Sequence, residues 1–301
     1  MEVICGADLL ARCHILATPC SASILEAKNI VTSPNATVLF HNHPMLNRIL
    51  LLGLLTAGLV RAEDVKDSYS ETHPLDPRGD VRIENVNGAI LIQTWARPEV
   101  SVQVEKIASS PDYLKAIKVE ITSDPDSLSV KTHLPKHEFA WHDLIDWSWI
   151  KGERGRVDLT LMVPSGVRLG KIVGVNGSIT LEGTHGAVDA TTVNGAIHAT
   201  GLREGKLTTV NGSVHASVDK FDADSHLTVS TVNGSVAILL PKDAGASVNV
   251  STVNGQVSCD FPIKIEADKG FFGHSLTGVI GPGGGSVKVS TVNGSVHLQS
   301  L

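Results

Sequence analysis

The stretch that decides the fold is Val287-Lys288-Val289-Ser290-Thr291-Val292-Asn293-Gly294-Ser295-Val296-His297-Leu298. Apolar and polar residues alternate before Asn293-Gly294 and alternate again after it, which is typical of two short strands that each bury one face. Glycine tolerates positive φ, and asparagine is among the few other residues that do. The pattern therefore predicts a bend at Asn-Gly between two strands.

Val-Asn-Gly is a repeat that occurs seven times, with its asparagine at Asn87, Asn176, Asn194, Asn211, Asn233, Asn254 and Asn293. From Asn176 onward the spacings are 18, 17, 22, 21 and 39 residues. The last spacing is twice the others, which predicts a degenerate copy near residues 271–279. A β-branched residue stands three positions after each asparagine, and threonine stands two positions before it in the last five copies, at Thr192, Thr209, Thr231, Thr252 and Thr291.

Two all-β architectures fit this repeat. In a β-meander each Asn-Gly closes a tight hairpin. In a single-stranded β-solenoid, or β-helix, each repeat of 17–22 residues is one coil that stacks on the next. We favour the solenoid because a hairpin does not require the same threonine and β-branched residues in every copy. The solenoid predicts an inward ladder of hydrogen-bonded amides formed by Asn176, Asn194, Asn211, Asn233, Asn254 and Asn293.

Composition supports a folded, strand-rich protein. The chain of 301 residues is 42% hydrophobic and 19% charged, but only 4% aromatic, and it contains 28 glycines. The core must therefore be built from aliphatic side chains with frequent turns, which suits strands. A net charge of −6 argues against a nucleic-acid partner.

The first part of the chain resembles an export signal preceded by extra residues. A basic start at 45–48, an apolar run at 49–60 and small Ala62 predict a signal peptide at residues 45–62 that is cleaved after Ala62. Residues 1–44 are then expected to be an upstream extension of the reading frame. No later apolar run has the length of a membrane helix, so the mature chain is predicted to be periplasmic or on the cell surface, with no membrane span.

Residues 63–79 are polar and contain proline, which predicts a linker before a solenoid domain at residues 80–301. Residues 80–164 are less regular and are expected to form the first coils with insertions. Alternation predicts strands over residues 81–83, 90–95, 100–106, 117–121, 128–131 and 157–163. Ser110, followed by proline, is expected to cap one helical turn.

Residues 132–156, approximately, are predicted to form an insertion, and this segment is rich in tryptophan. Its candidate ligand surface consists of Trp141, Trp147, Trp149, His137 and His142. Exposed tryptophans could stack on sugar rings, and histidines could hold a metal. The same aromatic side chains could instead cover an open end of the solenoid. We favour the cap, and predict no metal site and no cofactor.

Other polar residues give weaker signals. His198, His215 and His297 share one outward phase, and His198 and His215 are expected in neighbouring coils, where they could share a divalent ion. Asp219, Asp222 and Asp224 lack the glycine and distal glutamate of a calcium loop. Residues 281–286 are glycine-rich and predict a flexible connection, and Cys259 is expected in the core. No nucleophile motif or other catalytic residue is identified.

The Thr-Val-Asn-Gly-Ser-Val units, together with Val81-Arg82-Ile83-Glu84-Asn85-Val86-Asn87-Gly88 and the segment at 157–166, resemble the bacterial putative-adhesin family of unknown function (DUF4097-like). The resemblance covers about residues 80–300. It implies an exported β-solenoid at the cell surface, and it carries no catalytic signature.

Three functions follow as hypotheses. The favoured one is an exported, non-enzymatic, adhesin-like scaffold that contacts an envelope protein or a surface glycan. The first alternative is a carbohydrate-binding module that uses the tryptophan-rich insertion. The second is a polysaccharide-cleaving β-helix, which would need paired carboxylates along one groove.

Overall fold

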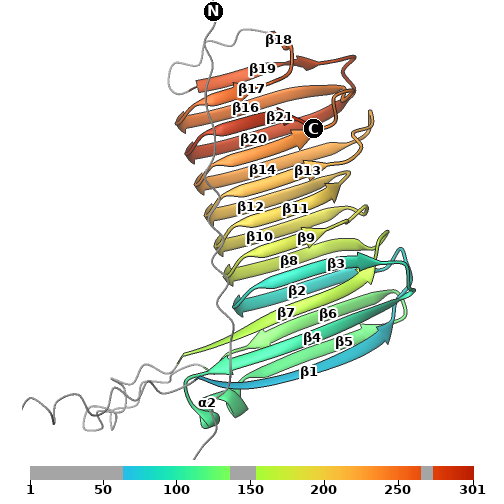
Figure 1. Ribbon diagram of the computed structural model, residues 1–301, viewed down its shortest axis with the longest axis vertical. Coiled ribbons are helices and arrows are strands. Elements are labelled where there is room, and N and C mark those ends of the chain that lie inside the picture. The colour runs from blue at the N-terminus through green and yellow to red at the C-terminus, as the bar shows by residue number, and fades with distance from the viewer. Residues whose placement is uncertain (1–63, 136–153, 266–273) are drawn as a thin grey trace, which may run out of the picture. The chain divides into compact units, whose positions relative to one another are not determined.

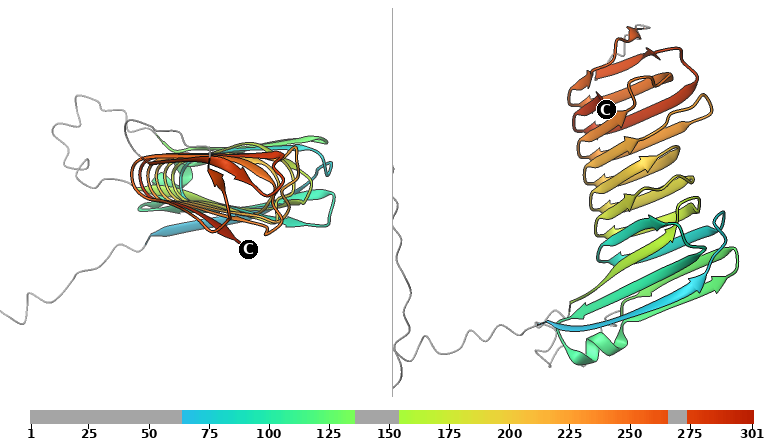
Figure 2. Two further views of the ribbon diagram at one scale, coloured as in Figure 1. Left: turned by 90° about the horizontal axis from the view of Figure 1, so that it is seen from above. Right: turned by 45° about the vertical axis from the view of Figure 1, so that its right-hand side comes forward.

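The computed structural model describes residues 64–135, 154–265 and 274–301, which lie in one compact unit, and they fold into two facing β-sheets (Figures 1 and 2). In spatial order, sheet A has 10 strands: β1 (Val65–Pro74), β4 (Glu99–Ala108), β7 (Gly155–Pro164), β3 (Ile90–Trp95), β9 (Ile179–Glu182), β11 (Ile197–Leu202), β13 (Val214–Val218), β15 (Val236–Leu240), β21 (Val296–Ser300) and β17 (Val257–Cys259). Sheet B has 11: β18 (Lys264–Ile265), β19 (His274–Ile280), β16 (Ala246–Asn254), β20 (Gly285–Asn293), β14 (His226–Asn233), β12 (Gly205–Asn211), β10 (Val188–Asn194), β8 (Arg168–Asn176), β2 (Asp80–Asn87), β6 (Ser127–His133) and β5 (Lys118–Asp124).

Each Val-Asn-Gly copy joins a strand of sheet B to the next strand in sheet A. The resulting coils are β2–β3, β8–β9, β10–β11, β12–β13, β14–β15, β16–β17 and β20–β21. Adjoining coils pair in parallel with their asparagines in register, as Asn194 does with both Asn176 and Asn211. The meander alternative is wrong, because the two strands that flank each Asn-Gly lie in different sheets. The fold is all-β and solenoid-like.

The coils do not stack in chain order at either end. Near the N-terminal end, β2–β3 lies between β8–β9 and the pair β6 and β7. Near the C-terminal end, the last coil in the chain, β20–β21, lies between β14–β15 and β16–β17 (Figure 1). The expectation that repeat units simply follow one another is therefore wrong at both ends.

The expected degenerate coil near residues 271–279 is also wrong in the part that the structure describes. Strand β19 runs antiparallel to β16 as part of sheet B, and it does not continue through a corner into sheet A. The glycine-rich stretch after β19 leads to β20 on the other side of β16. Gly281, Gly283 and Gly284 have positive φ, and the nitrogen of Gly285 donates to the oxygen of Gly245, so this stretch is a tight crossing over the start of β16.

The predicted linker at residues 63–79 is wrong. Val65–Pro74 forms β1, which pairs along its length with β4 and extends sheet A. Polar residues misled the prediction because β1 is an edge strand whose side chains are mostly exposed. The six strands predicted between residues 80 and 164 are confirmed as β2 to β7. The helical turn α2 (Pro111–Ala116) is also confirmed, with Ser110 accepting a hydrogen bond from the nitrogen of Tyr113.

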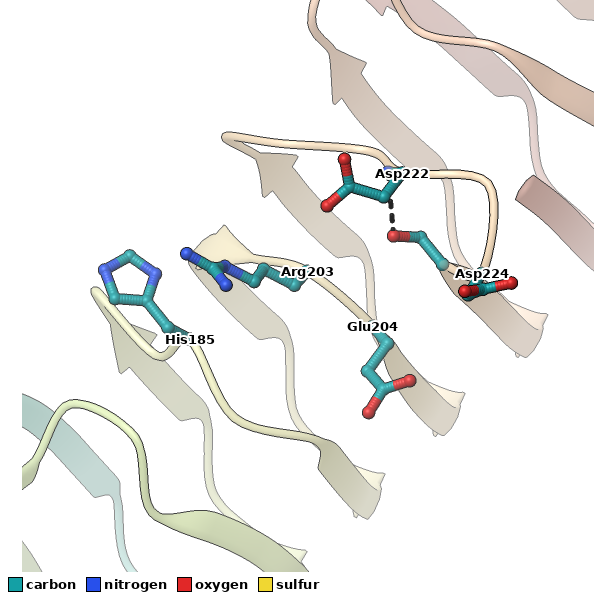
Figure 3. A pocket seen from close by; sticks show the side chains of 6 residues that line it. His185, Arg203, Glu204, Asp222 and Asp224 are labelled. Atoms are coloured by element: carbon teal, nitrogen blue, oxygen red, sulfur yellow. Dashed lines mark hydrogen bonds between the residues drawn. The ribbon is translucent and has the colours of Figure 1, made fainter. Parts of the chain in front are cut away.

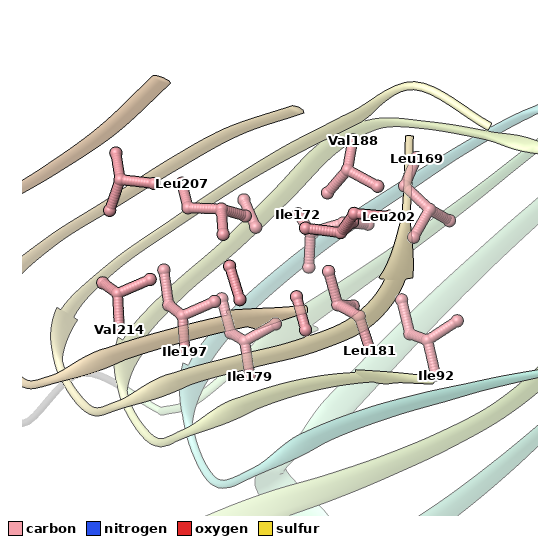
Figure 4. Packing of buried hydrophobic residues seen from close by; sticks show 14 of the residues in the cluster. Ile92, Leu169, Ile172, Ile179, Leu181, Val188, Ile197, Leu202, Leu207 and Val214 are labelled. Carbon is pink, nitrogen blue, oxygen red and sulfur yellow. The ribbon is translucent and has the colours of Figure 1, made fainter. Parts of the chain in front are cut away.

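The core lies between the two sheets and is almost wholly aliphatic. Alternation places Val188 and Ala190 of β10 inside, opposite Ile197 and Ala199 of β11. Figure 4 shows Val188 and its neighbours from sheet B facing the isoleucines and leucines of sheet A. Burying one such Val, Leu or Ile side chain contributes about 1.5–3 kcal/mol. The repeating coils thus share one continuous core.

Candidate functional site

The Asn-Gly bends form one exposed corner along the stack of coils. Six asparagines each donate from Nδ2 to the Oδ1 of the asparagine in the adjoining coil at 2.8–2.9 Å, in the order Asn254, Asn293, Asn233, Asn211, Asn194 and Asn176, and Asn87 accepts the last bond. The expected inward direction of these side chains is wrong, because all but half-buried Asn87 are exposed. Alternation alone would put them inside, but the bend begins at the asparagine and turns its side chain to solvent.

In five of the seven coils, the buried position at this corner belongs to a threonine two residues before the asparagine. These side chains are 0–5% exposed: Thr192, Thr209, Thr231, Thr252 and Thr291. Each Oγ1 donates to the glycine carbonyl of the adjoining coil, as Thr209 does to Gly195 at 2.9 Å. The sequence analysis missed this role, although the recurrence of threonine at one phase was the available signal.

The glycine of each repeat is required mainly by close packing of one coil on the next. Among the Val-Asn-Gly glycines in the described residues, Gly88 alone has a positive φ, 119°. A Cβ on Gly212 would lie 2.5 Å from the carbonyl carbon of Gly195 and closer still to its oxygen. The glycines of the other coils have the same environment. The expectation that these glycines serve a positive φ is therefore wrong except at Gly88.

Replacing Asn233 by Asp tests the amide ladder. Asn233 donates to Asn211 at 2.9 Å and accepts from Asn293 at 2.8 Å. The carboxylate still accepts from Asn293, but it cannot donate to Asn211 and it faces the Asn211 oxygen. We expect the free energy of unfolding to fall by about 1 kcal/mol, because solvent screens the repulsion at this exposed corner. Urea midpoints measure it. Asn249→Asp, on the outer face of β16, is the control and should stay within about 0.5 kcal/mol; equal losses would refute the ladder's contribution.

Beside the amide ladder runs a line of exposed valines on the outer face of sheet B. Six of them are 37–53% exposed: Val86, Val193, Val210, Val232, Val253 and Val292. Among the described residues, Leu301 is the remaining large hydrophobic side chain with comparable exposure. Next to the valines stands a column of small hydroxyl side chains in register, which runs Thr191, Thr208, Ser230, Ser290 and Ser251. A contiguous apolar line of this kind on a soluble surface is typical of a contact site.

The outer face of sheet A carries the predicted histidines. His198, His215 and His297 are exposed, as the alternation predicted. His198 and His215 are direct register partners, with ring centroids 6.1 Å apart. Ala237 pairs with His215 on one side and with His297 on the other, so it separates these two histidines. The Nδ1 of His297 is 2.6 Å from the Ser258 hydroxyl.

The loops at the opposite corner from the asparagines enclose a shallow pocket of about 260 Å³. It is lined by His185, Arg203, Glu204, Asp222, Asp224 and Ser225 (Figure 3). The Asp222 carboxylate is 2.9 Å from Lys220 Nζ, and Figure 3 shows it pointing in a different direction from that of Asp224. Throughout the described residues, no three His, Cys, Asp or Glu side chains gather in an arrangement suited to a metal.

Two remaining predictions concern the tryptophan-rich insertion and Cys259. Trp141, Trp147, Trp149, His137 and His142 lie outside the described residues, so the ligand surface and the cap both stay predictions. Cys259 is half-buried and packs against the core. Burial raises the pKa of its thiol above the usual value, so the reactive thiolate is disfavoured at neutral pH.

Comparison with known proteins identifies the family. The chain matches the Toastrack DUF4097 family over residues 65–299. The chain also resembles two solved structures: a "putative cell adhesion protein" from Clostridium sporogenes, 11% identical over 78% of this chain and 100% of that one with a TM-score of 0.44, and a "putative adhesin" from Bacteroides fragilis, 9% identical over 77% and 97% with a TM-score of 0.37. No curated protein matches the sequence. The family match covers most of the chain and ends with the last strand, so the chain belongs to the Toastrack DUF4097 family.

Proposed function

We propose that the chain is an exported, non-enzymatic, adhesin-like scaffold that contacts an envelope protein or a surface glycan through the outer face of sheet B. The observation that carries the proposal is the valine line, because six of the seven most exposed large hydrophobic side chains in the described residues share it. The threonines and serines beside it supply hydroxyl groups in five consecutively stacked coils, from β10–β11 to β16–β17. A partner with an extended, repeating surface would meet the same pair of columns at each step of about 4.8 Å.

The surface is stiff enough to present these columns in fixed positions. The coils are held to their neighbours by parallel strand pairing in both sheets and by the amide ladder, and five of them also by a buried threonine. The backbone therefore loses little conformational entropy on binding, which favours recognition by a preformed surface. The hydroxyl column is part of the strands themselves and needs no loop movement.

Substitution of two valines tests this surface. We expect Val210→Lys combined with Val232→Lys to weaken binding of residues 63–301 to immobilised envelope fragments of the producing bacterium at least about tenfold. The charges stand where the apolar contact would form and leave the core untouched. The matched control adds two lysines to the outer face of sheet A, as Ser217→Lys and Gln299→Lys. Unchanged binding of the valine variant, or an equal loss in the control, would refute the proposed surface.

Export forms the second part of the proposal. The folded domain starts close to the expected cleavage point, since β1 and the family match both begin at Val65. Within the described residues, no helix has both the length and the apolar character needed to cross a membrane. These observations fit a signal peptide at residues 45–62 that is removed before the chain reaches the periplasm or cell surface.

The cleavage point is directly testable. We expect the exported protein to begin at Glu63, because small Ala62 closes the apolar run at the position where signal peptidases cut. Edman sequencing or intact mass of protein from the periplasmic or surface fraction measures this. Exported protein that begins at Met1 or Cys5 would contradict it.

The non-enzymatic part of the proposal rests on the side chains of the outer faces. Glu84 of strand β2 is paired with Lys171 at 2.5 Å. This hydrogen bond lowers the pKa of the Glu84 carboxyl group. A general acid would need a raised pKa instead. Burial raises the pKa of the Cys259 thiol, which disfavours the thiolate that a cysteine nucleophile requires.

A further inference from the structure

We propose that His198 and His215 form a binding site for one divalent transition-metal ion, of the copper, nickel and zinc class, on the outer face of sheet A. The two residues are paired in register on the neighbouring parallel strands β11 and β13. Both side chains are exposed, so an ion can reach them without any rearrangement of the core. The inference does not depend on the proposed function.

The two rings lie within about 1 Å of the separation that one shared ion requires. A metal–nitrogen bond to imidazole is about 2.0–2.1 Å, and a ring nitrogen lies about 1.1 Å from the centroid, so two imidazoles at neighbouring coordination positions (about 90–110°) on one ion have centroids about 4.5–5.2 Å apart. The observed centroid distance is 6.1 Å, with the ring planes inclined at 47°. Strands about 4.8 Å apart bring the two Cβ atoms close, and rotation of the two exposed side chains can close the remaining difference of about 1 Å.

The flanking positions leave room for the other ligands of the ion. In the same column, Thr180 stands on one side of the pair and Ala237 on the other, and both are small. Two imidazoles leave the remaining coordination positions to water, and no third His, Cys, Asp or Glu among the described residues completes a larger cluster. Imidazole favours transition metals over Ca²⁺ and Mg²⁺, and affinity should follow the order Cu²⁺ above Ni²⁺ and Zn²⁺.

A bound ion would link two coils. His198 belongs to coil β10–β11 and His215 to coil β12–β13, so both ligands are supplied together only when these coils are stacked. Because the unfolded chain does not hold the two rings at this spacing, the ion stabilises the folded state. Metal binding and thermal stability should therefore change together.

His297 provides an internal control within the same column. It has the same phase relative to its Asn-Gly bend, but its register partners are Ala237 and Ser258 instead of a second histidine. Its Nδ1 is already 2.6 Å from the hydroxyl of Ser258. A single exposed imidazole lacks the chelate effect of the pair, so it should contribute little to binding.

The experiment is a titration of the full chain with Cu²⁺. Calorimetry measures the binding, and the nitrogen couplings in the electron paramagnetic resonance spectrum identify imidazole ligands. We expect His198→Gln and His215→Gln each to weaken the tightest site in this domain at least about tenfold and to abolish the Cu²⁺-induced rise in melting temperature. His297→Gln should leave both unchanged. The paired variant His198→Gln with Ala237→His should restore binding, because it rebuilds adjacent histidines one coil further along.

Three results would overturn the proposal. The first is Cu²⁺ binding and melting-temperature shifts that are the same in His198→Gln and His215→Gln as in the unsubstituted chain. The second is an equal loss in His297→Gln, which would mean that single histidines account for the binding. Failure of Ala237→His to restore the site would likewise contradict adjacency as its cause. All of these substitutions lie on the exposed face, so folding can be checked independently in the absence of metal.

Discussion

Replacing Gly212 by Ala is expected to lower the free energy of unfolding by at least about 3 kcal/mol, at the upper end of the range for overpacking. The added methyl would lie 2.5 Å from the carbonyl carbon of Gly195 and closer to its oxygen, and both are backbone atoms that no rotamer change can move. Relief requires that coil β12–β13 separate from coil β10–β11, which weakens strand pairing on both sides of the corner. Urea unfolding followed by circular dichroism measures the loss.

Gly205→Ala is the matched control. Gly205 lies at the start of the same strand, β12, and a Cβ there would be 3.3 Å from the nearest atom, the oxygen of Val188, which a small shift can accommodate. We expect this variant to lose about 1 kcal/mol or less. If Gly212→Ala lost no more than Gly205→Ala, close approach of the coils would not be the reason for the repeated glycine.

Replacing Thr209 by Val has the second largest expected effect, a loss of about 2 kcal/mol. Valine keeps the shape and the β-branch of threonine, so the strand and the packing are preserved. It removes the hydroxyl that donates to the Gly195 oxygen at 2.9 Å in a position only 1% exposed, and leaves that carbonyl desolvated. The midpoint of urea unfolding at constant slope gives the difference.

Thr208→Val separates this hydrogen bond from a general effect of the substitution. Thr208 is the preceding residue in β12 and lies on the outer face of sheet B, where it is half-buried. We expect its replacement to change stability by no more than about 0.5 kcal/mol. Similar losses at both positions would show that the buried hydroxyl has no special contribution, and would contradict its assigned role.

The strands and the stacking of repeats could be predicted because they follow from local patterns. Alternation around each Asn-Gly determines which side chains are buried, and it correctly predicted that His198, His215 and His297 face outward. The direction of the asparagines could not be obtained in this way. At a corner the period of two no longer applies, so the threonine two positions earlier is buried and the asparagine is exposed.

The repeat pattern could not predict the order of the coils, for a different reason. Each copy offers the same pairing partners to any other copy, so the sequence around Asn293 is compatible with stacking next to Asn233 or at the end of the array. The edge strand β1 was missed because its exposed polar residues resemble those of a loop. The outer-face histidines were found as a group, but their separation depends on the spacing of two strands and on ring orientation.

The position of β20–β21 has a consequence for how the chain folds. Coil β20–β21 separates β14–β15 from β16–β17, although both of these coils precede it in the chain. During synthesis β16–β17 emerges first, and its register with β14–β15 would satisfy the same asparagine and threonine hydrogen bonds as the native neighbour does. The protein therefore has a competing arrangement with one coil displaced to the end of the stack. The native order therefore requires that β14 and β16 are unpaired when the segment Gly285–Leu301 inserts between them.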